Sequence, residues 1–224
     1  EMTSSLVGSE MCIRDSVGAV LGFKTYKGEK IGVKVSSSFI SEEQAWLNLE
    51  ELGSRNFNEV KESARNAWND VMNRVRVEGG TDEQLRTFYS CLYRSLLFPR
   101  KFYEVDKYGN IVHYSPYNGE VRRGYMYTDT GFWDTFRALF PFLNLMYPSV
   151  NKEIQEGLAN SYEESGFLPE WASPGHRHCM VGNNSASVVA DAYLKGCQTE
   201  KIDLLYEAVL HGANHVHPQV CLLY

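Results

Sequence analysis

From Ser41 onward, apolar residues recur at helical spacing, and this pattern constrains the fold more than any other feature of the chain. Apolar side chains three and four positions apart share one face of a helix. Capping boxes are predicted at Ser41 with Gln44 and at Thr81 with Gln84. Such capping residues and glycines separate the runs, because capping side chains satisfy free N–H groups and glycine readily ends a helix. Pro141 is expected to kink or split the fourth helix. The expected helices cover residues 41–53, 57–79, 81–99, 132–147 and 148–164, then 184–195 and a last one from about 199.

Before Ser41 the pattern is that of strands. Residues 17–26 and 30–39 are rich in Val, Ile, Phe and Gly, and residues 27–29 between them predict a hairpin turn. Two strands alone do not make a stable sheet. We therefore expect residues 17–40 to be the last strands of a β-domain whose beginning is missing. The whole is predicted to be mainly α, and the regular rhythm of helices joined by long loops suits an α/α toroid.

The two ends have a different character. Residues 5–16 show neither helical nor strand periodicity, and they resemble translated sequencing-adapter DNA, as do residues 221–224. We expect residues 1–16 and 218–224 to be foreign to the protein, and the rest to be an internal piece of a longer gene. The predicted organisation is then given by three segments: strands over 17–40, linker helices over 41–80, and the first part of a helical domain over 81–217.

Composition excludes several functions. Lys and Arg total 22 against 28 Asp and Glu, a net charge of −6 without a basic run, so a nucleic-acid partner is not expected. The five cysteines include no C-x-x-C pair, which argues against a disulfide framework or a zinc site. No apolar run is long enough to span a membrane. No signal peptide is visible, and nothing in the sequence indicates an oligomeric state.

The segment 128–137 carries the candidate site. On a helix, Trp133, Asp134 and Arg137 share one face. That face combines a flat apolar platform, a hydrogen-bond acceptor and a planar cation, a mixture that suits sugars, because a pyranose has an apolar face and a rim of hydroxyls. Arg137 is equally expected to pair with Asp134. The opposite face predicts core: Phe132, Phe136, Leu139, Phe140 and Leu143.

The loop over 165–182 offers further candidates. Glu170 beside Trp171 repeats the pairing of an acid with an aromatic platform. His176 and His178 form an H-x-H pair, which without a third ligand is weak evidence for a metal. Structural roles are expected for the other polar residues: helix capping for Asp129, Asn183 and Asn184, and a solvated helix end for Glu163 and Glu164.

Taken in order along the chain, these segments resemble glycoside hydrolase family 92, the exo-acting α-mannosidases. The similarity runs from about residue 31 to about residue 196 and is specific because the motifs occur in sequence. The motifs lie at residues 41–49, 88–89, 92–94, 99, 127–129, 132–137, 166–171, 180–182, 190–193 and 195–196.

The resemblance implies a β-sandwich, linker helices and an (α/α)6 toroid that hydrolyses terminal α-mannosides of glycans with inversion and with calcium. It implies that Trp133 and Asp134 help form the terminal-mannose subsite, with Arg137, Glu170 and Trp171 as further sugar contacts. The general acid, the general base and most calcium ligands are expected C-terminal to Tyr224. The chain alone is therefore expected to be inactive. A periplasmic or secreted location follows from the resemblance only.

Two alternatives remain open at this point. One is another α/α-toroid glycosidase, such as a glucosidase or a trehalase-like enzyme, which would use the same acid and aromatic residues in its cleft. The other is a non-catalytic, carbohydrate-binding helical domain. Paired acids further along the gene would distinguish turnover from binding alone.

Overall fold

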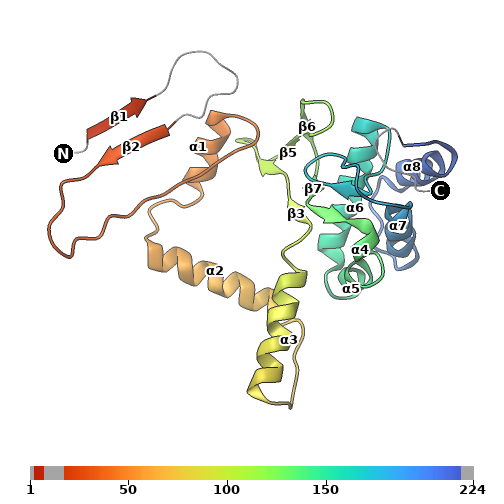
Figure 1. Ribbon diagram of the computed structural model, residues 1–224, viewed down its shortest axis with the longest axis horizontal. Coiled ribbons are helices and arrows are strands. Elements are labelled where there is room, and N and C mark those ends of the chain that lie inside the picture. Colours follow the sequence, from red (N-terminus) through yellow and green to blue (C-terminus); the bar gives the residue numbers. More distant parts are fainter. Residues whose placement is uncertain (1–2, 8–17, 218–224) are drawn as a thin grey trace. The chain divides into compact units, whose positions relative to one another are not determined.

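The structure is a computed structural model that describes residues 3–7 and 18–217. The chain divides into two compact units, Glu1–Lys34 and Val35–Tyr224. In the first unit, strand β1 (Thr3–Val7) pairs antiparallel with β2 (Gly18–Gly22) (Figure 1). The prediction that residues 218–224 are foreign lies outside the described residues, as does most of the same prediction for residues 1–16.

The hairpin predicted between residues 17–26 and 30–39 is wrong in its second half. The turn forms, with the Glu29 N–H donating to the Tyr26 carbonyl at 3.1 Å. Residues 30–39, however, contain no strand, and their apolar side chains are exposed, Val35 to 81%. A strand needs a partner for its backbone groups, and β2 has β1 as its partner instead. The β-sandwich itself stays a prediction.

The second unit begins with three helices, and two of them start at the predicted capping residues. Ser41 accepts from the Gln44 N–H at 3.1 Å, and Thr81 forms a full capping box with Gln84. Asn56 caps the second helix in the same way, with Glu59 completing the box. The three helices are α1 (Glu42–Glu50), α2 (Phe57–Met72) and α3 (Asp82–Ser95).

The aperiodic stretch 99–127 folds into short strands. β4, β5 and β6 make an antiparallel three-stranded sheet, and β3 pairs with β7 (Figure 1). Strands this short hold too few residues for an alternating pattern to be recognised. They are β3 (Arg100–Lys101), β4 (Glu104–Val105), β5 (Ile111–Tyr114), β6 (Val121–Arg123) and β7 (Tyr127–Thr128).

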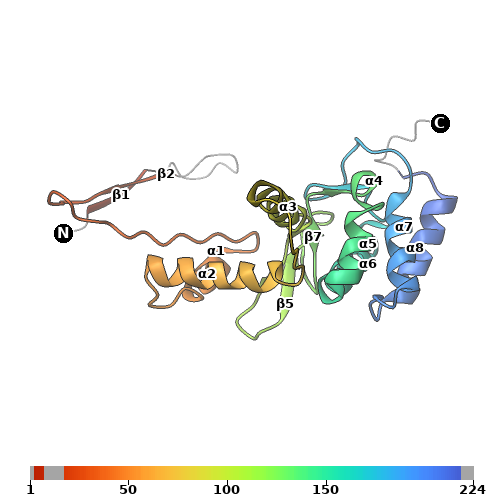
Figure 2. The ribbon, with the colours of Figure 1, turned by 90° about the horizontal axis from the view of Figure 1, so that it is seen from below.

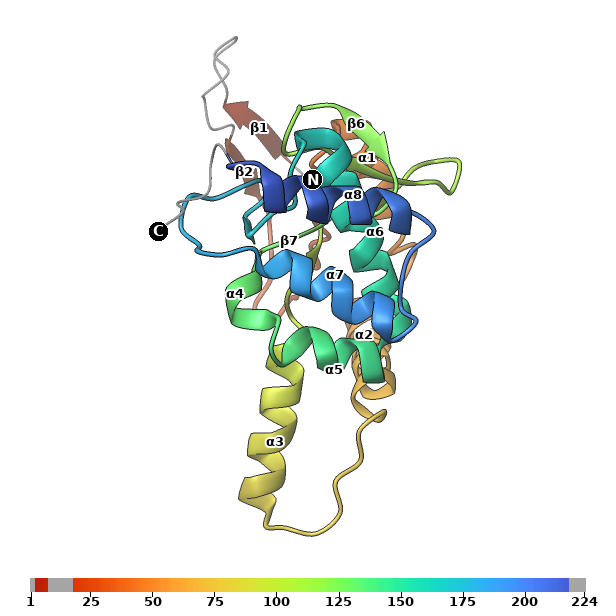
Figure 3. The ribbon, with the colours of Figure 1, turned by 90° about the vertical axis from the view of Figure 1, so that its right-hand side faces the viewer.

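The remaining helices form the core, and four of them pack side by side (Figures 2 and 3). The predicted helix 132–147 is split at residues 136–138, and Pro141 lies in the first turn of the second part, where the N–H that proline lacks is not needed for a helical hydrogen bond. The helices are α4 (Phe132–Thr135), α5 (Leu139–Met146), α6 (Pro148–Ser165), α7 (Asn184–Leu194) and α8 (Ile202–Asn214).

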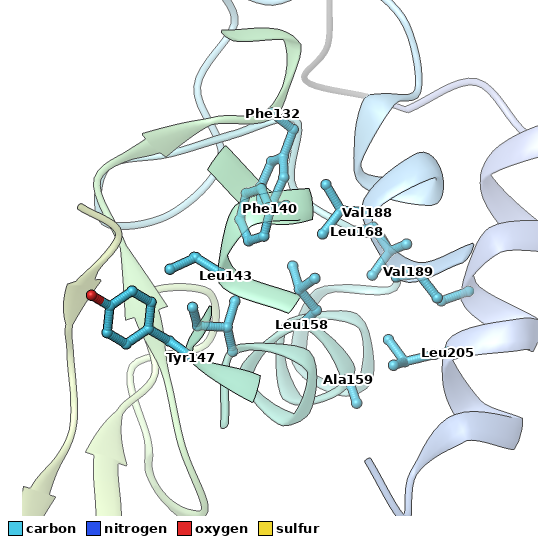
Figure 4. Packing of buried hydrophobic residues seen from close by; sticks show 12 residues of the cluster. Phe132, Phe140, Leu143, Tyr147, Leu158, Ala159, Leu168, Val188, Val189 and Leu205 are labelled. Atoms are coloured by element: carbon cyan, nitrogen blue, oxygen red, sulfur yellow. The ribbon is translucent and has the colours of Figure 1, made fainter. Parts of the chain in front are cut away.

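The hydrophobic core lies where α4 to α8 meet (Figure 4). Phe140 is fully buried and stacks on Phe132 at 5.6 Å between ring centroids. Burying a side chain of this size contributes roughly 1.5–3 kcal/mol to stability. Leu143, Leu158 and Leu205 complete the centre of the cluster. The prediction of a mainly α chain is confirmed, and within the described residues no helix combines the length and apolarity that crossing a membrane requires.

Candidate active-site segment

Two segments far apart in the sequence meet at a short antiparallel pair of strands. β8 (Thr130–Gly131) pairs with β9 (Trp171–Ala172), with Gly131 opposite Trp171. The ladder is extended by the Phe132 N–H, which donates to the Glu170 carbonyl at 3.0 Å. The predicted sugar contacts on α4 are therefore brought next to those on the loop after α6.

The single turn of α4 sorts its side chains between core and solvent. Phe132 is buried against Phe140, whereas Trp133 is 42% exposed and Asp134 is also exposed. Thr135 holds the turn, because its hydroxyl donates to the Gly131 carbonyl at 2.8 Å. The predicted division of this segment into a core face and a polar face is confirmed.

Because Gly131 has no side chain, the Trp171 ring and the Asp134 carboxylate can approach its backbone closely. A Cβ atom on Gly131 would lie 2.6 Å from Cε3 of Trp171 and 2.9 Å from Oδ2 of Asp134, both closer than real Cβ contacts. The Trp171 ring and the Asp134 carboxylate thus converge on the same point of backbone. Trp133, Asp134 and Trp171 form what we call the indole–carboxylate cluster.

Arg137 contacts the cluster through Trp133. Its guanidinium carbon lies 4.6 Å from the centroid of the Trp133 ring, and Nη1 donates to the Trp133 carbonyl at 3.3 Å. It also lies 4.7 Å from the Phe136 ring. Among the described ion pairs, none joins Arg137 to Asp134, so the alternative of an internal salt bridge is not realised. The Asp134 carboxylate remains available to a ligand.

Glu170 has a different environment from Asp134. Its side chain is buried, with the residue only 5% exposed, and it accepts from the Asn184 N–H at 2.7 Å and from the Ser185 hydroxyl at 2.5 Å. Burial raises the pKa of this carboxyl to about 7, although these hydrogen bonds act in the opposite direction. The carboxyl satisfies the free N–H groups at the start of α7. Its predicted role as a sugar contact stays a prediction.

The side-chain capping expected from Asn183 and Asp129 does not form. Asn183 stands at the N-cap of α7, but its side chain makes no capping bond, because Glu170 occupies that position. Asp129 does not cap α4 either. It adopts a left-handed backbone with φ of 59°, pairs with Arg100 at 2.6 Å and accepts from the Ser173 hydroxyl at 3.0 Å. Asp129 therefore fastens the loop that follows β9.

The predicted solvated helix end is wrong for one of its two acids. Glu163 is exposed and pairs with Lys201 at 3.1 Å. The Glu164 side chain is only 6% exposed and lies 2.8 Å from Nε2 of the buried His113. The sequence could not show this pairing, because His113 comes from β5, fifty-one residues earlier.

No metal site is formed by this part of the chain. Within residues 3–7 and 18–217, no three histidine, cysteine or acidic side chains gather closely enough to hold an ion. Nε2 of His176 instead lies 2.9 Å from the Ser165 hydroxyl. The calcium dependence that the family resemblance implies stays a prediction.

Comparison with known proteins identifies the family. The model of the glycosyl hydrolase family 92 catalytic domain matches residues 44–221. A relative from the fungus Arthroderma benhamiae, described as an uncharacterized secreted glycosidase, is 28% identical over 191 residues, which cover 82% of this chain and 20% of the relative.

Two solved structures support the same family. The family GH92 inverting mannosidase BT2199 from Bacteroides thetaiotaomicron is 46% identical, with a TM-score of 0.85 over 97% of this chain and 32% of its own. The family GH92 α-mannosidase BT3965 from the same organism, in complex with mannoimidazole, is 26% identical, with a TM-score of 0.74 over 81% of this chain and 24% of its own. The chain thus spans a third or less of these relatives. It belongs to glycosyl hydrolase family 92.

Proposed function

We propose that the chain is part of an exo-acting mannosidase that removes terminal α-linked mannose from glycans with inversion of configuration. The observation that carries the proposal is the indole–carboxylate cluster. The Asp134 carboxylate and the Trp171 ring both lie against the backbone of Gly131, and the exposed Trp133 precedes Asp134 on α4. The support from relatives is that two similar structures are described as mannosidases, one of them as inverting. Membership of family 92 also argues against the other toroid glycosidases.

The cluster can bind a hexose through two complementary contacts. An indole ring offers a flat apolar surface to the C–H face of a pyranose, and a carboxylate accepts hydrogen bonds from two adjacent hydroxyls. Arg137 already covers one face of Trp133. The sugar is therefore left with the other face of Trp133 or with Trp171, while Asp134 takes the hydroxyls.

Inverting hydrolysis needs two carboxyl groups about 6.5–9.5 Å apart, one as general acid and one as general base. Asp134 and Glu170 do not make this pair, because the Glu170 carboxyl is held by the start of α7. We place the general acid and base C-terminal to Tyr224, so that this chain binds the terminal sugar without cleaving it. The non-catalytic alternative predicts the same binding here and differs only in that later segment.

Three further properties belong to the same proposal. The helices α4 to α8 would form the first part of an (α/α)6 toroid. Calcium would be required for turnover, with its ligands mostly outside residues 17–217. The enzyme would work in the periplasm or outside the cell, which is supported by the secreted relative.

The test measures the binding of methyl α-D-mannopyranoside to the 224-residue chain by saturation-transfer NMR. We expect saturable binding at the indole–carboxylate cluster, and we expect Trp133→Ala to raise the dissociation constant of this site about tenfold, a loss on the order of 1.4 kcal/mol. Trp46→Ala is the matched control, because Trp46 is also an exposed indole but lies on α1. Equal binding by all three proteins would reject the proposal.

A further inference from the structure

A cavity separate from the indole–carboxylate cluster lies between the β5–β6 turn, the end of α6 and the loop after β9. It is a cavity of about 510 Å³, within the range of roughly 300–1,000 Å³ that is usual for small-ligand pockets. None of the indole–carboxylate cluster lines it. Its principal lining residues are Tyr117, Glu164, Ser165, Phe167, His176 and His217, and we call it the Glu164 cavity.

Four rings follow one another around this cavity. Tyr117 contacts His176 at 4.7 Å between centroids, His176 contacts His217 at 4.5 Å, and His217 contacts Phe167 at 4.5 Å. Burial raises the pKa of the Tyr117 phenol to about 12, so the phenol stays neutral at physiological pH. The wall is therefore largely aromatic, with flat surfaces of the kind that pack against sugar rings.

The tautomer of His176 follows from its hydrogen bonds. The Ser165 hydroxyl has one proton, and two carbonyl oxygens compete for it, that of Ser161 at 2.6 Å and that of Phe167 at 2.9 Å. The Ser165 oxygen must then accept from Nε2 of His176, 2.9 Å away. Burial and the neighbouring His217 lower the pKa of His176 to about 4, so the ring is neutral and Nδ1 is an acceptor.

The charge of Glu164 is balanced by His113. Nδ1 of His113 lies 2.8 Å from the Gly124 carbonyl and must donate to it, while Nε2 lies 2.8 Å from Oε1 of Glu164. Either His113 is an imidazolium beside a carboxylate, or both groups are neutral and Glu164 holds the proton. In both cases the pair has no net charge, and Oε2 of Glu164 is an acceptor.

Two acceptors at this cavity therefore lack donors. Within the described residues, neither Oε2 of Glu164 nor Nδ1 of His176 has a hydrogen-bond partner, and both atoms are buried. Buried polar atoms of folded proteins are almost always paired. We propose that the Glu164 cavity binds a hexose unit, whose hydroxyls donate to these two atoms and whose apolar face packs on Tyr117 or Phe167.

A hydroxylated ring fits better than a cation. A buried amine would need a compensating negative charge, and the neutral Glu164–His113 pair does not supply one. This inference goes beyond the proposed function and does not depend on it, because the two sites share no ligand-contacting side chain. The loop between Trp171 and Arg177 nevertheless contributes to both.

The experiment follows the imidazole nitrogens of His176 by NMR in the ¹⁵N-histidine-labelled 224-residue chain. Methyl α-D-mannopyranoside is expected to shift the His176 Nδ1 resonance saturably. Tyr117→Ala is expected to weaken this response about tenfold, while Tyr108→Ala, which removes an exposed tyrosine from the β4–β5 turn, leaves it unchanged. Trp133→Ala, which disables the indole–carboxylate cluster, is also expected to leave it unchanged.

Three results would overturn the inference, and the first needs no variant to fold. One is the absence of any His176 shift with the sugar. Another is loss of the shift in Trp133→Ala, which would place the sugar at the cluster alone. The third is a saturable shift with methylammonium chloride but none with the sugar, which would assign the cavity to amines. Failure of the proposed function would show instead as unchanged total sugar binding in Trp133→Ala.

Discussion

The chain contains two acid–tryptophan neighbours that are alike in sequence and differ in the folded molecule. Asp134 follows Trp133 on the exposed side of a one-turn helix, whereas Glu170 precedes Trp171 and is buried at the start of α7. Both indoles belong to the same cluster, but only one of the two carboxyl groups is free for a ligand. The difference arises from what lies nearby in space. The start of α7 presents free N–H groups to Glu170, whereas within residues 18–217 no hydrogen-bond donor is paired with the Asp134 carboxylate.

Replacing the two acids should separate a structural carboxyl from a ligand-binding one. Glu170→Ala leaves the Asn184 N–H and the Ser185 hydroxyl without an acceptor, so we expect the free energy of unfolding to fall by about 3 kcal/mol. Asp134→Ala should change it by about 0.5 kcal/mol or less. Urea denaturation at pH 5.5 measures both. Equal losses would show that the two carboxyl groups have the same role.

The buried position of Glu170 predicts that the stability of the folded chain depends on pH. The folded pKa of Glu170, about 7, lies above the ordinary glutamate value of 4.5 that applies to the unfolded chain, so between these values the folded chain binds more protons than the unfolded one. Its contribution to stability is therefore fully present below about pH 4.5 and is lost as the pH rises through 7. One pKa unit corresponds to about 1.4 kcal/mol, and we expect a loss on the order of 2 kcal/mol between pH 5 and pH 8.

Denaturation of the chain at a series of pH values tests this prediction, with Glu170→Ala as the control. In the control, the free energy of unfolding should not show this decrease between pH 5 and pH 8. A wild-type chain that becomes more stable from pH 5 to pH 8, relative to the control, would contradict the assigned environment of Glu170.

Gly131 tests whether the two halves of the cluster depend on one another. Gly131→Ala places a methyl group within 3 Å of both Trp171 and Asp134, and overpacking of this kind costs about 1–3 kcal/mol. We expect mannoside binding to weaken along with stability. Gly32→Ala is the control, because a Cβ there meets nothing within 4 Å. If Gly131→Ala changes stability and mannoside binding no more than the control does, the close approach of the Trp171 ring and the Asp134 carboxylate to Gly131 is wrong.

The smallest expected effect concerns Arg137. Its contact with the Trp133 ring is at an exposed site, where such interactions contribute about 0.5–1 kcal/mol. Arg137→Gln should therefore lower the free energy of unfolding by no more than this and should change tryptophan fluorescence. A large loss of stability would point to a buried ion pair that the structure does not contain.

The sequence predicted what depends on neighbours in the chain. The division of Phe132 from Trp133, the split of the predicted helix 132–147 and the caps at Ser41 and Thr81 all follow from local spacing. These features could be predicted because a helix satisfies most of its own backbone groups and needs only one apolar face to pack.

The predictions that were wrong required distant partners. Residues 30–39 have strand-like composition but no neighbouring strand. The sequence around Glu164 predicts a solvated helix end, but its side chain is buried beside His113. Asp129 likewise caps no helix, because Arg100 and Ser173 approach it from other segments. Each of these contacts joins residues that are far apart in the chain, and no periodicity marks them.

The most direct test of the account is a crystal structure of the chain with methyl α-D-mannopyranoside. We predict one sugar at the indole–carboxylate cluster, with two adjacent hydroxyls within hydrogen-bond distance of Asp134 and its apolar face against Trp133 or Trp171. A sugar bound only at other surfaces, with Asp134 and both indoles free of it, would contradict the central claim.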